Sequence, residues 1–203
     1  MWSVNNLTKK GYLIVIALIS SLGGFLFGYD TAIISGTIPF VKEKFSLDTG
    51  MEGWYVSCAL TGCIAGIIVA GECSDRIGRK KSLILSGLLF CISAIGCLVS
   101  FTFSELVAYR IVGGVGIGMA SMLSPLYISE ISPPHNRGRL VSLYQFAITL
   151  GILSAYFVNS FLLKVSTENH VNLSTFWNEV VNKDIWKSML GSAAIPAICF
   201  FVA

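Results

Sequence analysis

Two ionisable side chains lie inside long apolar stretches of the sequence, where a charge is costly. Asp30 lies well along the first stretch, and Arg110 lies just inside the fourth. Each costs about 2.5–3.5 kcal/mol at the centre of a bilayer, so we expect the two side chains to pair. A proton on Asp30 would remove one buried charge and release Arg110, which would bias a protein that has two conformations. A purely structural ion pair, or an Asp30 hydrated near the membrane surface, fits the residues equally well.

Charged residues are also dense in two short connections between apolar stretches. Asp75 and Arg79 belong to the first connection, whereas Glu130 and Arg137 flank the second. Asp75 can satisfy backbone amides at a helix start, and the planar guanidinium of Arg79 suits a carboxylate. The alternative is that these residues are ordinary charges that set membrane topology.

The elements that hold these residues are predicted to be membrane-spanning helices. Of the 203 residues, 54% are hydrophobic and 12% are charged, and the mean hydropathy is +0.75. This composition excludes a water-soluble globular protein. A bilayer span needs about 20 apolar residues, and the sequence contains six such stretches without strand-like alternation. Their approximate ranges are 12–40, 54–72, 82–101, 105–129, 140–163 and 185–203. The predicted fold class is an all-α polytopic membrane protein.

The distribution of Lys and Arg predicts the orientation of these helices. Eight of the 14 fall at the N-terminus and in the connections on its side, and five fall on the other side. Because positive charge favours the cytoplasm, the N-terminus is predicted to be cytoplasmic. The long connection 164–184 then lies outside. Apolar residues recur along it at helical spacing and predict a short surface helix or lid: Leu173, Phe176, Trp177, Val180 and Val181.

Other functional classes find little support in the sequence. The net charge of +3 is too small and too dispersed for nucleic-acid binding. The six cysteines lack metal-ligand spacing, and neither a nucleophile triad nor paired carboxylates within a span occur. We therefore predict no metal, no cofactor and no enzymatic activity. The glycines at four-residue spacing, Gly62 with Gly66 and Gly114 with Gly118, predict close packing of helices rather than a phosphate-binding loop.

Four motifs together carry a resemblance to a known family. The connection Gly71–Lys81 resembles the signature loop of the major facilitator superfamily. Three more motifs resemble those of its sugar porter family: Phe27–Asp30, Arg110–Gly118 and Pro125–Leu140. The similarity covers essentially the whole chain and looks closest to bacterial proton-linked carriers of the D-xylose type.

The resemblance implies a fold and indicates which part of that fold residues 1–203 correspond to. Members of the family have about twelve helices in two six-helix halves, with the sugar between the halves. Residues 1–203 then correspond to the N-terminal half, a six-helix transmembrane domain made of two inverted three-helix repeats. Because the sequence stops inside its sixth span, we expect an N-terminal fragment that lacks the C-terminal six-helix domain.

The resemblance also implies roles for individual residues. Asp30 matches the proton-coupling acid of symporters, and Arg110 matches its partner. Gln145 matches a glutamine that contacts the sugar, as suits an amide that both donates and accepts, and Phe27 matches an aromatic residue beside the sugar. Ile152 stands where a xylose carrier offers a second glutamine, which puts xylose itself in doubt. The residues of the two charged connections match a cytoplasmic network that latches the halves together: Asp75, Arg79, Glu130 and Arg137.

The expected function is therefore proton-coupled symport of a monosaccharide, a pentose or a hexose, across the cell membrane by alternating access. A facilitative uniporter of the same fold is the alternative, which Asp30 disfavours. A truncated half that transports nothing, or a membrane sensor, is a third interpretation. The expected partners are the sugar, the proton, the lipid bilayer and the missing C-terminal half.

Overall fold

Six membrane-length helical segments make up the protein in a computed structural model that describes residues 4–168 and 184–202. Five are single helices: α1 Val4–Phe45, α2 Thr49–Ile77, α3 Arg79–Val99, α4 Phe103–Ile131 and α5 Arg137–Glu168. The sixth consists of α7 Ile185–Ser192 and α8 Ala194–Val202. Each of the six is long and apolar enough to cross a membrane, which confirms the predicted spans. The short helix predicted on Leu173–Val181 of the connection 164–184 lies outside the described residues.

Most of the helices are longer than the predicted apolar stretches, because their polar flanks remain helical. The connections are correspondingly short. Only Gly78 separates α2 from α3, and its φ of 89° lies in the left-handed region that glycine adopts without strain. The start of α4 is fixed by a capping box, in which the Thr102 hydroxyl accepts from the Glu105 amide and the Glu105 carboxylate accepts from the Thr102 amide.

The sixth span differs from the single helix predicted for residues 185–203. It breaks at Ala193, whose amide bonds to the carbonyl of Leu190, only three residues earlier. Pro196 explains the break, because proline has no N–H to donate to the carbonyl of Ser192, four residues before it. The prolines inside α1 and α4, Pro39 and Pro125, do not interrupt their helices.

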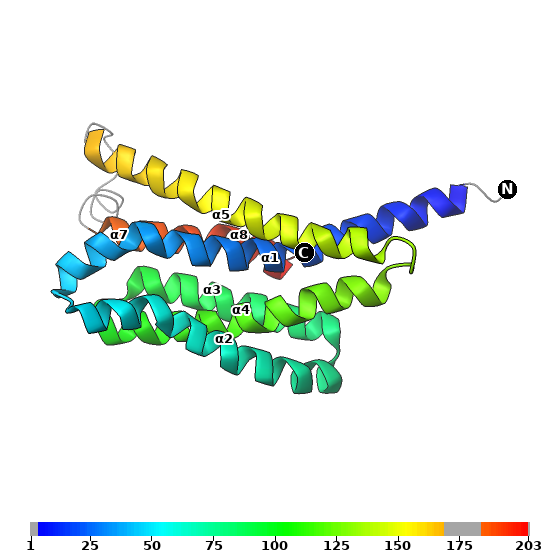
Figure 1. The fold of residues 1–203 in the computed structure, drawn as a ribbon, viewed down its shortest axis with the longest axis horizontal. Coiled ribbons are helices and arrows are strands. Elements are labelled where there is room, and N and C mark those ends of the chain that lie inside the picture. Colours follow the sequence, from blue (N-terminus) through cyan, green and yellow to red (C-terminus); the bar gives the residue numbers. More distant parts are fainter. Residues whose placement is uncertain (1–3, 169–183, 203) are drawn as a thin grey trace.

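The packing of the helices is consistent with two inverted repeats. Figure 1 shows α1 lying beside α5, and α2 beside α4, along the length of the bundle. The first helix of each three-helix unit therefore packs on the second helix of the other unit, and the two first helices, α1 and α4, also contact each other. This exchange places α1 and α4 next to each other at the centre, where they bring their charged residues together.

Glycines at these contacts let the helix backbones touch, as predicted. A methyl group added at Gly62 or Gly66 of α2 would collide with backbone carbonyls of α4, and one at Gly114 or Gly118 of α4 would collide with those of α2. Such close approach is how helices associate in lipid, where no hydrophobic force drives them together. Gly28 of α1 meets the backbone of α5 in the same way. The α1–α5 and α2–α4 pairs are therefore both packed backbone to backbone.

Candidate functional site

The ion pair predicted between the first and fourth spans is present in the structure. Nη2 of Arg110, on α4, lies 3.4 Å from Oδ2 of Asp30, on α1. The Arg110 side chain is 3% exposed, whereas that of Asp30 is 17% exposed. A charge as deeply buried as Arg110 is stable only with a partner, and Asp30 supplies the negative charge. Asp30 is the more exposed member of the pair.

An aromatic ring forms another side of the Arg110 site. The guanidinium carbon of Arg110 lies 5.7 Å from the ring centroid of Tyr55, which comes from α2 and is fully buried. The hydroxyl of Tyr55 is 2.7 Å from Oγ1 of Thr37 on α1. Sequence reasoning missed Tyr55, because an aromatic residue in an apolar stretch resembles ordinary core. The only signal was its place in a span that packs on the helix of Arg110.

The two residues predicted to contact sugar lie on neighbouring helices. The α1 and α5 helices run parallel, because Gly24 and Gly28 of α1 meet Tyr144 and Ile148 of α5 in the same order. Because Gly151 of α5 also lies between Phe25 and Tyr29 of α1, this register puts Gln145 level with residues 21–25, about 8–14 Å along the axis from Asp30 toward the N-terminal end of the bundle. Gln145 is exposed, and Phe27 is half-buried. Both positions suit a site beside Asp30, and their contact with sugar remains a prediction.

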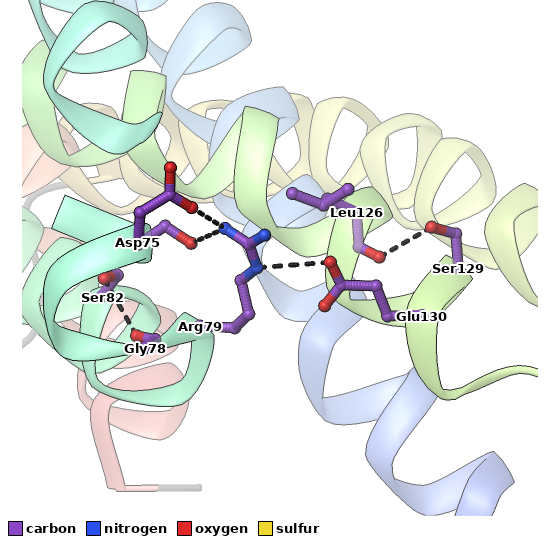
Figure 2. A network of polar contacts seen from close by, with 8 residues as sticks. Asp75, Gly78, Arg79, Ser82, Leu126, Ser129 and Glu130 are labelled. Carbon is purple, nitrogen blue, oxygen red and sulfur yellow. Dashed lines mark hydrogen bonds and ion pairs between the residues drawn. The ribbon is translucent and has the colours of Figure 1, made fainter. Parts of the chain in front are cut away.

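The structure also brings together three of the four residues of the predicted charge network. Figure 2 shows the Arg79 guanidinium between the carboxylates of Asp75 and Glu130. Nη1 of Arg79 lies 3.2 Å from Oδ1 of Asp75, and Nε lies 3.3 Å from Oε1 of Glu130. Arg79 also donates to the hydroxyl of Ser74. The fourth residue, Arg137, is exposed and forms no ion pair with the part of the chain that the structure describes.

This network joins three helices at the N-terminal end of the bundle. Asp75 lies near the end of α2, Arg79 is the first residue of α3, and Glu130 lies near the end of α4. The single-residue connection at Gly78 places Arg79 one helical turn from Asp75, at the i,i+4 spacing of an ion pair. Its role as a latch is a prediction, but its geometry links helices from both three-helix units.

Comparison with known proteins decides the family. The family profile described as "Sugar (and other) transporter" matches residues 16–203. The chain belongs to the sugar transporter family. The resemblance stated from the four motifs is thereby confirmed.

Characterised relatives and solved structures agree with this membership. The chain is 39% identical to the D-xylose-proton symporter of Escherichia coli (strain K12) over 98% of its length, and 42% identical to the arabinose-proton symporter of Bacillus subtilis (strain 168) over 96%. The structure of the proton:xylose symporter XylE, a major facilitator superfamily protein bound to 6-bromo-6-deoxy-D-glucose, matches with a TM-score of 0.83 and 40% identity, covering 96% of this chain. This sugar transporter chain has the fold of a six-helix half and spans 44%, 40% and 44% of those three proteins.

At the opposite end of this sugar transporter bundle, Asp184 joins the first and sixth spans. Its Oδ1 lies 3.1 Å from Nζ of Lys44, at the end of α1, and its Oδ2 lies 3.5 Å from Nζ of Lys187 in α7. The Lys187 ammonium also lies over the rings of Phe101 and Trp186. Partial burial raises the pKa of the Asp184 carboxyl, but hydrogen bonds and charge from Lys44 and Lys187 outweigh burial, so its pKa lies below the usual value. From the sequence, these lysines are distinguishable only as charges that set membrane topology.

Replacing Asp184 by Asn is expected to lower the unfolding temperature at pH 7 by up to about 4 °C. Because the folded-state pKa of Asp184 is lowered, its stabilising effect is present above the unfolded pKa of about 3.9 and disappears as pH falls through the folded value. The difference between wild type and Asp184→Asn should therefore shrink as pH falls below the unfolded pKa and disappear once pH is below the folded pKa of Asp184. Thermal melts of both proteins across pH test this. Glu43→Gln, an exposed acid at the same end without an ion pair among the described residues, should leave the melting temperature unchanged.

Proposed function

We propose that the protein carries a monosaccharide across the cell membrane together with a proton, by alternating access. The observation that carries this proposal is the ion pair of Asp30 and Arg110, buried where two spans cross. An ionisable pair inside a membrane bundle is costly to maintain and is typical of a proton pathway. The names of the D-xylose-proton and arabinose-proton symporters among the relatives support the same reading.

In the proposed cycle, a proton binds Asp30 and neutralises one member of the pair. Arg110 then loses its anionic partner, and the balance between two conformations shifts. Sugar binds beside this site, where the Gln145 amide donates to one hydroxyl and accepts from another, and Phe27 lies against the sugar ring. The substrate is a pentose or a hexose, and the apolar Ile152 disfavours xylose itself.

A second six-helix half is proposed to complete the sugar site. The chain spans less than half the length of the relatives named above, and transporters of this kind bind substrate at the interface of two repeats. With the N-terminus in the cytoplasm, as the Lys and Arg bias predicts, the network of Asp75, Arg79 and Glu130 faces the cytoplasm. Arg137 joins this network through the second half, and the network opens to release sugar inside.

The experiment that tests this function measures proton movement with sugar. Cells that lack sugar carriers of their own express the chain alone, or the chain joined to the C-terminal half of the D-xylose-proton symporter. If the proposal is correct, adding a pentose or hexose to lightly buffered cells that express the joined protein alkalinises the medium. Sugar uptake without alkalinisation would identify a uniporter. Uptake by neither protein would favour a sensor or an inactive half.

Replacing Arg79 by Gln is expected to loosen the proposed latch. The substitution removes both ion pairs of Arg79, each of which contributes little singly, so we expect the open form to gain about 3–10-fold in population. The measurement is the labelling rate of a cysteine introduced by Ser129→Cys, next to Glu130, in a protein whose native cysteines are alanine. Labelling should become about 3–10-fold faster in Arg79→Gln.

The matched control is Arg76→Gln. Among the described residues, Arg76 pairs only with Glu72, four residues earlier on the same helix, so its loss leaves the described links between helices intact. The labelling rate should not change in this variant. Equal acceleration by both substitutions would mean that general loss of positive charge, rather than the network, controls access.

A further inference from the structure

We propose that Tyr55 is a positioning residue that holds Arg110 in place while Asp30 carries a proton. This inference rests on the proposed function of the ion pair and extends it to the step at which Arg110 loses its partner. Arg110 is 4% exposed as a whole residue, so it has little access to water when Asp30 is neutral. Something within the bundle must then stabilise the guanidinium, or the protonated state is inaccessible.

The surroundings of Arg110 favour Tyr55 for this task. Asp30 reaches only the Nη2 atom, and Nε of Arg110 has no hydrogen-bond partner among residues 4–168 and 184–202. The other titratable groups near the guanidinium are Tyr55, Cys58 and Cys97. A neutral thiol is a weak acceptor, whereas the face of an aromatic ring attracts a cation, and most strongly where both are desolvated. Tyr55 is fully buried, with its ring centroid 5.7 Å from the guanidinium carbon.

The ring of Tyr55 is itself fixed to the helix of Asp30. The Thr37 hydroxyl donates to the carbonyl of Ile34 at 2.8 Å. Because that hydroxyl has one hydrogen, the hydroxyl of Tyr55 must be the donor in its 2.7 Å bond to Thr37. Because this bond does not involve Asp30, neutralising Asp30 does not by itself release the ring. The ring is the group that acts on Arg110, and the hydroxyl only orients it.

A double-mutant cycle in the purified protein tests this role without measuring transport. Asp30→Asn mimics the protonated acid, because it keeps an oxygen that can accept from Arg110 but removes the negative charge, so stabilisation of the guanidinium then depends more strongly on Tyr55. Tyr55→Leu should therefore lower the unfolding temperature by about 4–8 °C more in the Asp30→Asn background than in wild type. Tyr55→Phe, which keeps the ring, should cost the same in both backgrounds. A ring that merely fills space would give equal losses for Tyr55→Leu in both, and that additivity would overturn the proposal.

A further variant covers the case in which the double mutant does not fold. Adding Arg110→Met removes the uncompensated charge and should restore folding to the Asp30→Asn, Tyr55→Leu protein. If folding is not restored, the defect does not come from Arg110, and the proposal is overturned. The outcome is also separable from that of the proposed function. Suppose that Tyr55→Leu lowers the unfolding temperature more in the Asp30→Asn background, but that Asp30→Asn still accumulates sugar against its gradient. This result would support the role of Tyr55 and contradict symport through Asp30.

Discussion

Replacing Asp30 by Asn is expected to abolish uphill accumulation of sugar while leaving sugar exchange intact. Asparagine has nearly the same size as aspartate, and its amide oxygen still accepts a hydrogen bond from Arg110. It cannot take up a proton, so transport loses its link to the proton gradient. The steady-state accumulation ratio should fall to about one, the value for purely downhill movement. The other member of the pair, Arg110, is always protonated and has no acceptor, so it cannot replace Asp30 as proton acceptor.

The measurement compares two assays on one preparation in liposomes. Accumulation is followed under an imposed pH gradient, and exchange is followed as counterflow of labelled sugar without a gradient. Asp48→Asn, which alters an exposed acid just before α2, is the matched control and should retain both activities. Unimpaired accumulation in Asp30→Asn would contradict the proposed role of Asp30 in coupling sugar transport to the proton gradient. Loss of exchange together with accumulation would instead assign Asp30 to sugar binding or folding.

Replacing Gln145 by Ala is expected to raise the KM for sugar by about 10-fold or more, with a smaller change in the maximal rate. The amide is proposed to make two hydrogen bonds to the sugar, each of which contributes about 0.5–1.5 kcal/mol. Its loss removes binding that is similar in the ground state and the transition state, and such a loss appears chiefly in KM. The exposed position of Gln145 on α5 means that alanine leaves no cavity, so the fold should be unaffected.

Initial rates of uptake across sugar concentrations test this expectation. Ser142→Ala is the control, because Ser142 lies about one turn earlier on α5 and its hydroxyl bonds to the carbonyl of Arg139. It should leave KM unchanged. An unchanged KM for pentoses and hexoses alike in Gln145→Ala would remove this residue from the sugar site.

The spans and the central ion pair could be predicted because their physical signals are local and strong. A bilayer core requires a long apolar stretch, and a charge such as Arg110 inside one requires a partner. Only one carboxylate, Asp30, lay at a matching depth. The glycine contacts were likewise predictable, because four-residue spacing of glycine has few other uses in a membrane helix.

Features that depend on three-dimensional neighbours were not predictable in the same way. In the sequence, Tyr55 resembles an ordinary core residue, and only the packing of α2 on α4 places its ring beside Arg110. Asp184 lies immediately before the sixth span, and only the folded chain brings Lys44 beside it. The break at Ala193 has a local cause in Pro196, but Pro39 and Pro125 leave their helices continuous, so proline alone does not predict a break. Arg137 was assigned by resemblance, and a partner for it is proposed in the second half.

The backbone-to-backbone contacts of the glycines join α1 to α5 and α2 to α4 as two closely packed helix pairs within the bundle. The α1–α5 pair holds Asp30 and Gln145, and the α2–α4 pair holds Arg110, Tyr55 and Asp75. The ion pair of Asp30 and Arg110 therefore links the two helix pairs to each other. We expect a proton on Asp30 to weaken this link and let the α1–α5 pair shift against the α2–α4 pair. Spin labels on α5 and α2 would report this shift as a distance change on acidification, and an unchanged distance would show that the two pairs do not move relative to each other.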